Sequence, residues 1–109
     1  MAITGKTFAD GELPNTKTPL FTATLISLVR FFRLVNTDSA VRTVNVFVTR
    51  AGGGSRHIIE KDLQLAAAGS AGSMKDVLVD QLLTLSIGDA IEGQADTAAK
   101  VEYFISGGV

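Results

Sequence analysis

The sequence contains no cysteine and no tryptophan, and only one histidine and two prolines among its 109 residues. The absence of cysteine excludes a disulfide framework, thiol chemistry and the usual zinc sites. With a single histidine, a transition-metal site would need carboxylates alone, which is an unusual ligand set. We therefore expect no metal and no other cofactor.

Charge and long apolar runs are also scarce. Charged residues make up 19% of the chain and the net charge is −1, so nothing draws it generally to nucleic acid. No apolar stretch approaches the roughly 18 residues that suggest a membrane span. Residues 1–6 also lack the apolar run of a signal peptide. The sequence predicts neither a nucleic-acid nor a membrane partner.

The chain is nevertheless rich in apolar side chains, and its charge is unevenly divided. Hydrophobic residues make up 46% of it, which excludes a disordered polymer and suits one domain. Residues 30–56 carry five arginines and one acid, whereas residues 57–109 carry three lysines and eight acids. These charges either neutralise one another within the fold or form complementary patches that dock copies of the chain on each other or on a larger assembly.

Two segments give the strongest strand signals. Leu25–Asn36 is rich in branched and aromatic residues and apolar on both faces, which is typical of a covered strand. Arg30 and Arg33 are three residues apart, so a regular strand would point them to opposite faces. A bulge between them, which would bring both to one face, is therefore predicted. After a polar turn, Val41–Arg50 alternates between apolar and polar residues and completes a hairpin. Phe47 lies on its otherwise polar face and is a candidate contact residue.

The remaining sequence predicts an all-β fold: an antiparallel β-sandwich, jelly-roll-like, with about eight short strands. Residues 1–19 hold both prolines and are expected to form an extended N-terminal arm, followed by the sandwich domain over residues 20–109. The apolar spacing in Met74–Leu85 also allows a helix capped by Ser73, which is the alternative to strands there. Further strands are expected at residues 56–60, 75–80, 83–87, 91–95 and 100–106.

No catalytic arrangement emerges from the motifs. His57 lies on an expected strand, and the serines form no Gly-x-Ser-x-Gly elbow. The glycine-rich segment at residues 51–55 lacks the lysine and the following helix of a phosphate-binding loop. Asp76 and Asp80 leave a carboxylate pair for sugar hydrolysis open, although alternating exposed acids are usually solvated. We expect no enzyme and no catalytic residues.

Four features define the order of strands and turns over residues 26–109. They are the segment Phe31–Thr37, the alternating valines at 44, 46 and 48, the segment Gly88–Ala95, and the segment Val101–Val109. This pattern resembles small virion proteins of tailed bacteriophages that decorate or cement the capsid. The resemblance implies a structural protein on the capsid exterior, assembled in the host cytoplasm. It also implies a homo-oligomer, dimer or trimer, that bridges neighbouring copies of the major capsid protein.

On that resemblance, the expected interface residues are Arg42, Phe47, Arg50 and Arg56, together with the arm at residues 1–19. One alternative is a phage neck, tail-fibre or receptor-binding component. Another is a carbohydrate-binding β-sandwich, although a chain with no tryptophan and a single tyrosine, Tyr103, lacks the usual platform for stacking a sugar ring.

Overall fold

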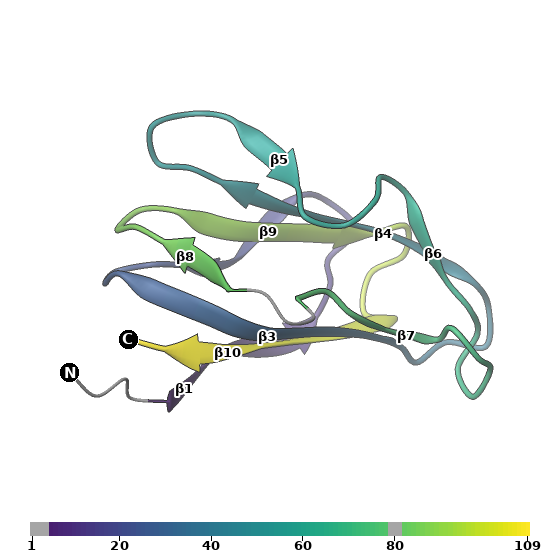
Figure 1. Cartoon of the computed structure of the whole chain (residues 1–109). Coiled ribbons are helices and arrows are strands. Elements are labelled where there is room, and N and C mark those ends of the chain that lie inside the picture. Colours follow the sequence, from purple (N-terminus) through teal and green to yellow (C-terminus); the bar gives the residue numbers. More distant parts are fainter. Residues whose placement is uncertain (1–4, 79–81) are drawn as a thin grey trace.

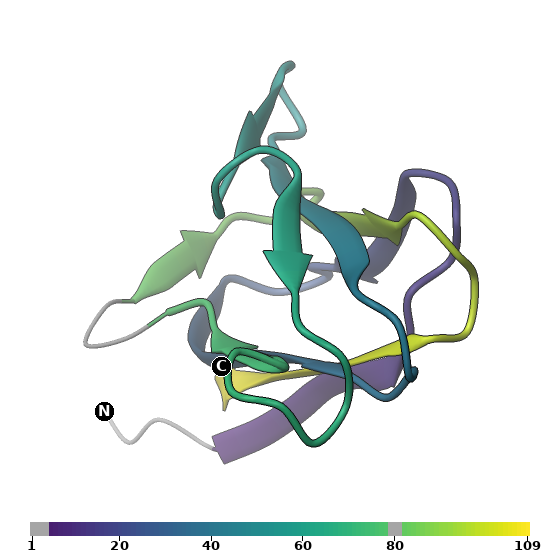
Figure 2. The ribbon, with the colours of Figure 1, turned by 90° about the vertical axis from the view of Figure 1, so that its right-hand side faces the viewer.

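The computed structural model describes residues 5–78 and 82–109, and in these residues every regular element is a β-strand. The strands form two antiparallel sheets packed face to face, seen as separate layers in Figure 2. Figure 1 labels the strands β1 (Gly5–Glu12), β2 (Thr18–Thr22), β3 (Ser27–Asn36), β4 (Arg42–Thr49), β5 (Ser55–His57), β6 (Leu63–Leu65), β7 (Met74–Asp76), β8 (Leu83–Leu85), β9 (Ala90–Ala95) and β10 (Val101–Gly108).

The strand order is that of a jelly roll. Sheet A has the order β1-β10-β3-β7, with β8 also pairing β3, and sheet B has the order β2-β9-β4-β5, with β6 also pairing β4. The first strand therefore pairs with the last and the second with the next to last, while β3 and β4 also pair with the short strands between them and β9. This nested winding of the two chain halves confirms the predicted fold class. β3 and β4 lie in different sheets, so the hairpin predicted for Leu25–Asn36 and Val41–Arg50 is wrong: the chain crosses from one sheet to the other at the turn between them.

Two positions of the jelly roll are each filled by a pair of short strands. β7 and β8 pair with opposite ends of β3, and β5 and β6 pair with opposite ends of β4. Ten described strands thus occupy eight positions, which agrees with the predicted number. The helix alternative for Met74–Leu85 is wrong for its described ends, because both form strands on β3. The rest of that segment includes residues 79–81, which lie outside the described residues.

Residues 5–19 belong to the sandwich instead of forming an arm separate from it. β1 pairs with β10 along its whole length. Phe8 of β1 stacks on Phe21 of β2, with ring centroids 4.6 Å apart, and Leu13 is fully buried in the core. The predicted boundary at residue 19 therefore does not separate two structural units in the described chain. The first part of the expected arm, residues 1–4, lies outside the described residues.

Alternating side chains build the core between the sheets. On β4, Val44, Val46 and Val48 point inward, as the sequence predicts. On β3, Val29 pairs with Gly107 and Phe31 with Ser106, which leaves Arg30 in a bulge. The bulge shifts the alternation by one residue, so the side chains that face the core change from odd-numbered before it to even-numbered after it. The buried core side chains on β3 and β10 are Val29, Phe32, Leu34, Val101, Tyr103 and Ile105.

The bulge lies at the start of the interval in which the sequence predicts it, and it requires a glycine on the neighbouring strand. A Cβ at Gly107 would lie 1.8 Å from the carbonyl oxygen of Leu28. Only glycine therefore allows β10 to approach β3 this closely.

Candidate docking surface

Among residues 5–78 and 82–109, no three His, Asp or Glu side chains gather as a metal site would require. The imidazole of His57 is exposed on β5, where its ring centroid lies 4.5 Å from that of Phe47. No helix in the same residues is long and apolar enough to cross a membrane. The surface features that remain are apolar and ionic.

Three large apolar side chains protrude from loops at one end of the sandwich. Leu25 and Ile26 lie between β2 and β3, and Ile87 lies between β8 and β9; they are 56%, 66% and 63% exposed. In Figure 1 this end is on the left, where the chain termini also lie. We call Leu25, Ile26 and Ile87 the apolar tip. Isolated apolar residues on a surface are ordinary, but side chains gathered on adjacent loops indicate an interaction site.

Backbone hydrogen bonds hold the two loops of the apolar tip together. The N–H of Ala23 donates to the carbonyl of Asp89 at 2.9 Å, and the N–H of Gly88 donates to the carbonyl of Ala23 at 2.8 Å. The apolar side chains are therefore presented on paired loops. Such preorganisation reduces the entropy lost when a partner binds.

The buried carboxylate of Asp89 fixes a third loop at this end. It accepts hydrogen bonds from the Arg50 guanidinium at 2.8 Å and from the N–H groups of Ala51 and Ser86 at 2.9 and 3.0 Å. The Ala51 hydrogen bond, followed by those from Arg50 and Ser86, lowers the pKa of Asp89. Arg50 also donates to the carbonyl of Thr84 at 2.9 Å. The β4–β5 and β8–β9 connections are thus joined through one ionised side chain.

Three exposed cationic side chains lie toward the same end of the sandwich as the apolar tip. They are Lys6 near the start of β1, Arg30 at the β3 bulge, in the half of β3 nearer the tip, and Arg56 of β5, which pairs with Val48 near the tip end of β4. Within residues 5–78 and 82–109, none of these three forms an ion pair. This end of the sandwich therefore carries unpaired positive charge among the described residues, which favours an acidic partner surface.

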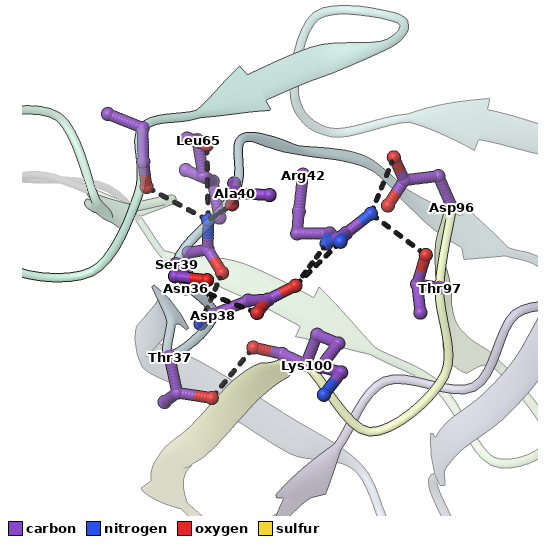
Figure 3. A network of polar contacts seen from close by, with 11 residues as sticks. Asn36, Thr37, Asp38, Ser39, Ala40, Arg42, Leu65, Asp96, Thr97 and Lys100 are labelled. Atoms are coloured by element: carbon purple, nitrogen blue, oxygen red, sulfur yellow. Dashed lines mark hydrogen bonds and ion pairs between the residues drawn. The ribbon is translucent and has the colours of Figure 1, made fainter.

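The opposite end of the sandwich is joined by polar side chains (Figure 3). The buried amide of Asn36 donates to the carbonyls of Ala40 and Ala66, both at 2.9 Å, and more weakly to that of Leu65 at 3.3 Å. Its side-chain oxygen accepts the N–H of Asp38 at 2.9 Å. One side chain thus links the β3–β4 loop to the segment after β6.

The four predicted contact residues do not lie together. Arg50 and Arg56 are at the tip end, whereas Arg42 is at the opposite end and Phe47 is on the outer face of sheet B. They were predicted by residue type, as arginine and aromatic side chains, although the strand expected at Val41–Arg50 already places Arg42 and Arg50 at its two ends.

Arg42 is engaged within its own fold. Its Nε donates to Asp38 at 2.8 Å and its Nη1 donates to Thr97 at 2.9 Å, with Asp96 3.6 Å away (Figure 3). The side-chain hydrogen bond from Arg42 also lowers the pKa of Asp38. A contact role for Arg42 would require breaking bonds that join the β3–β4 and β9–β10 loops.

Phe47 is contacted from both flanks of β4. The ammonium of Lys17 lies 4.3 Å from the ring centroid, and His57 packs on it from β5. Lys17 is also 3.9 Å from the carboxylate of Glu92 on β9. Little of the Phe47 ring is left to stack on a sugar, which weakens the carbohydrate-binding alternative.

The residues of the apolar tip were missed as candidate site residues. Leu25 and Ile26 were assigned to the strongest strand, but β3 begins at Ser27, whose hydroxyl donates to the Leu25 carbonyl at 2.8 Å. A visible signal was Ile87 directly before Gly88-Asp89, because a large apolar residue inside a turn has no core to enter.

Comparison with known proteins adds no relative. No family model matches the chain, and no curated protein or solved structure matches it.

Proposed function

We propose that this chain is a structural virion protein that binds the outside of a tailed-phage capsid and bridges neighbouring copies of the major capsid protein. The observation that carries the proposal is the apolar tip: Leu25, Ile26 and Ile87, each more than half exposed on loops that are fixed to one another. Truncation of such clustered apolar anchors typically removes much of the binding energy of an interface.

Charge supports a particular kind of partner surface. Lys6, Arg30 and Arg56 lie toward the same end as the apolar tip and form no ion pair among the described residues. An acidic capsid surface with apolar depressions would complement both features. If the chain is oligomeric, several tips engage one shell, and each contact after the first is made at high effective concentration.

The fold is compatible with this role but does not decide it. Jelly rolls occur in viral capsid proteins, lectins and cupins, so function has to be argued from the surface. The resemblance over residues 26–109 directs the proposal to a virion, and the apolar tip provides an attachment site.

The test uses capsids of the phage that encodes the chain, prepared with its gene deleted, and the purified chain added back. We expect many bound copies at subunit junctions by cryo-electron microscopy and cosedimentation. The variant L25S/I26S/I87S should lose at least about tenfold in affinity. Val41→Ser is the matched control, because Val41 is 50% exposed but lies at the opposite end.

Each outcome separates the proposed role from its alternatives. A few copies confined to the neck or tail would favour the neck, fibre or receptor-binding alternative. Absence of the chain from virions would overturn the virion proposal altogether. Equal loss of attachment in the Val41→Ser control would show that the apolar tip is not the docking surface.

A further inference from the structure

The four edges of the two sheets differ in what they offer to a further strand. β5, β6, β7 and β8 have three residues each and divide the edges beyond β4 and β3 into short pieces. β2 forms the other edge of sheet B, and Pro19 within it lacks an N–H group. Short strands and prolines are two ways in which folded proteins block an edge. β1, with eight residues and no proline, uses neither, so it is the one long edge open among the described residues.

The hydrogen bond of Leu13 shows which backbone groups in the second half of β1 point away from β10. Leu13 follows directly after β1, and its N–H donates to the carbonyl of Val101 at 2.7 Å. Backbone groups alternate in direction along a strand, so Glu12 points away from β10 and Asp10 does the same. Their N–H and C=O groups are therefore directed to the open edge.

A bulge keeps the first half of β1 in the same alternation. Thr7 pairs with Ser106 and Asp10 pairs with Phe104, so β1 advances three residues where β10 advances two. Thr7 therefore directs its backbone groups to the open edge as Asp10 does, and Gly5, two residues earlier, does so as well. The residues that present backbone groups at the open edge are Gly5, Thr7, Asp10 and Glu12.

The side chains of β1 follow the same pattern around the bulge. Phe8 and Ala9 are half-buried and both pack against the core, Phe8 by stacking on Phe21. Thr7 and Asp10, which flank them, are exposed on the outer face. The order of inward and outward side chains is therefore the same when β1 is followed from either end.

We propose that two copies of the chain associate edge to edge through β1, in antiparallel orientation, with a twofold axis between the two Phe8–Ala9 segments. In this register Thr7 pairs with the partner's Asp10, and Gly5 pairs with the partner's Glu12. All four residues of the open edge are engaged, and each pair exchanges two backbone hydrogen bonds. The two A sheets become one continuous sheet by strand addition.

The bulge identifies the occupant as a second copy. A regular strand would leave one residue of β1 unmatched, because two residues instead of one separate Thr7 from Asp10. A second β1 has the same two residues there, so Phe8 lies opposite the partner's Ala9 and the count agrees. Any shift of this register would set at least one inward side chain against an outward one. A surface that matches a second copy of itself is what a twofold interface requires.

The side chains that meet in this register are compatible. On the inner face the large ring of Phe8 lies against the partner's small Ala9, and the twofold axis repeats this contact. On the outer face the Thr7 hydroxyl lies opposite the partner's Asp10 and can donate to its carboxylate. No charged residue of β1 lies directly opposite a like charge, and the two Asp10 carboxylates meet only on a diagonal. This inference does not depend on the proposed attachment to a capsid.

The first test is sedimentation of the purified chain between about 1 and 100 µM. We expect a monomer–dimer equilibrium without larger species, because the other three edges are blocked. Thr7→Pro removes an N–H group from the open edge but no bond to β10, and proline is tolerated in edge strands at such positions. Its association should be at least about tenfold weaker, because each dimer loses two hydrogen bonds.

Circular dichroism checks that the Thr7→Pro variant still folds. A wild-type chain that stays monomeric throughout the concentration range would overturn the proposal. Dimers that persist in a folded Thr7→Pro variant would do the same, because their interface would have to lie elsewhere.

Charge at position 7 tests the register itself. Thr7→Lys places an ammonium group opposite the partner's Asp10, twice in each dimer, so association should be about fivefold tighter than in the wild type. Thr7→Asp places a carboxylate there and should weaken association by about the same factor. Thr84→Lys is the matched control, because Thr84 is exposed on β8 at the opposite edge of sheet A. Equal association of the two Thr7 variants, or the same gain in Thr84→Lys, would contradict the pairing of residue 7 with residue 10.

The apolar-tip variant L25S/I26S/I87S keeps the two proposals distinguishable. It should dimerise as the wild type does, while losing attachment to capsids. If it loses dimerisation instead, the apolar tip is the self-association surface and the β1 edge is not.

Discussion

The two ends of the sandwich hold their loops together in a similar way but leave different surfaces. At one end the buried amide of Asn36 bonds to carbonyls from two loops, and Arg42 joins a third to Asp38. At the other end Asp89 takes the same central position with a carboxylate. Yet that end exposes Leu25 and Ile26, whereas the Asn36 end is dominated by polar contacts. Fixing loops and exposing apolar side chains are therefore separate properties.

The two ends of the sandwich are expected to contribute differently to stability and to binding. The Asn36 end satisfies its buried polar groups internally and contributes mainly to the folded state. The tip end uses Asp89 to position loops whose apolar side chains contribute little to folding. Substitutions at Asn36 and Asp89 should therefore affect unfolding, and substitutions at the apolar tip should affect only binding.

The largest effect is expected for Asn36→Leu. The substitution leaves the carbonyls of Ala40 and Ala66 without their donor in a buried site, which costs about 3 kcal/mol of unfolding free energy. Urea denaturation measures the change. Thr37→Val is the control: its hydroxyl donates to the Lys100 carbonyl at an exposed site, and its loss should cost less than about 1 kcal/mol. Similar losses in both variants would refute the central role of Asn36.

A smaller loss is expected for Asp89→Asn. The amide can still accept from one or two neighbours, and Arg50 keeps its bond to the Thr84 carbonyl. We expect the thermal unfolding midpoint to fall by a few degrees, less than for Asn36→Leu. Glu60→Gln is the control, because Glu60 is exposed and in no ion pair among residues 5–78 and 82–109. An unchanged midpoint in Asp89→Asn would mean that the tip loops are held by backbone bonds alone.

The contribution of Asp89 should disappear in acid. Hydrogen bonds from Ala51, Arg50 and Ser86 lower its pKa in the folded chain below the ordinary 3.8. Stabilisation is therefore complete above that value and is lost as the pH falls through the lower, folded pKa. The difference in unfolding free energy between wild type and Asp89→Asn should stay constant near neutral pH and shrink in this acidic window. A difference that grows on acidification would contradict the assignment.

The smallest effect on folding is expected at the apolar tip itself. Ile26→Ser and Ile87→Ser replace side chains that are more than 60% exposed, so the unfolding free energy should stay within about 0.5 kcal/mol of wild type. Urea denaturation tests this with Phe32→Ser, a fully buried residue, as the contrast. A substantial loss in the tip variants would show that these side chains support the fold instead of serving a partner.

Much of the fold could be predicted because alternation is a local property. The three inward valines of β4 are visible in the sequence, whereas the predicted hairpin is wrong, because β3 and β4 lie in different sheets. β1 was predicted as part of an extended arm with at most a short strand over residues 4–8, because Gly5–Glu12 has few branched or aromatic residues. It becomes a full strand of the sandwich by pairing with β10, which lies almost the whole chain away. Pairings of that kind leave no local pattern.

The candidate site was harder to predict for the same reason. Asp38 lies four residues before Arg42, so their ion pair could have been anticipated. The bond between Arg50 and Asp89 spans 39 residues and only the folded chain brings it together. The exposure of Leu25 depends on where β3 begins, and strand boundaries are poorly marked in apolar segments.

The pairing of β1 with β10 also has a consequence for the order in which the molecule forms. Contacts between the two extremes of a chain are slow to make, so β1 should be among the last strands to dock. Until it does, the eight residues of β10 present an open hydrogen-bonding edge. Such an edge can recruit a strand from another chain, so timely closure by β1 protects the newly made protein from aggregation.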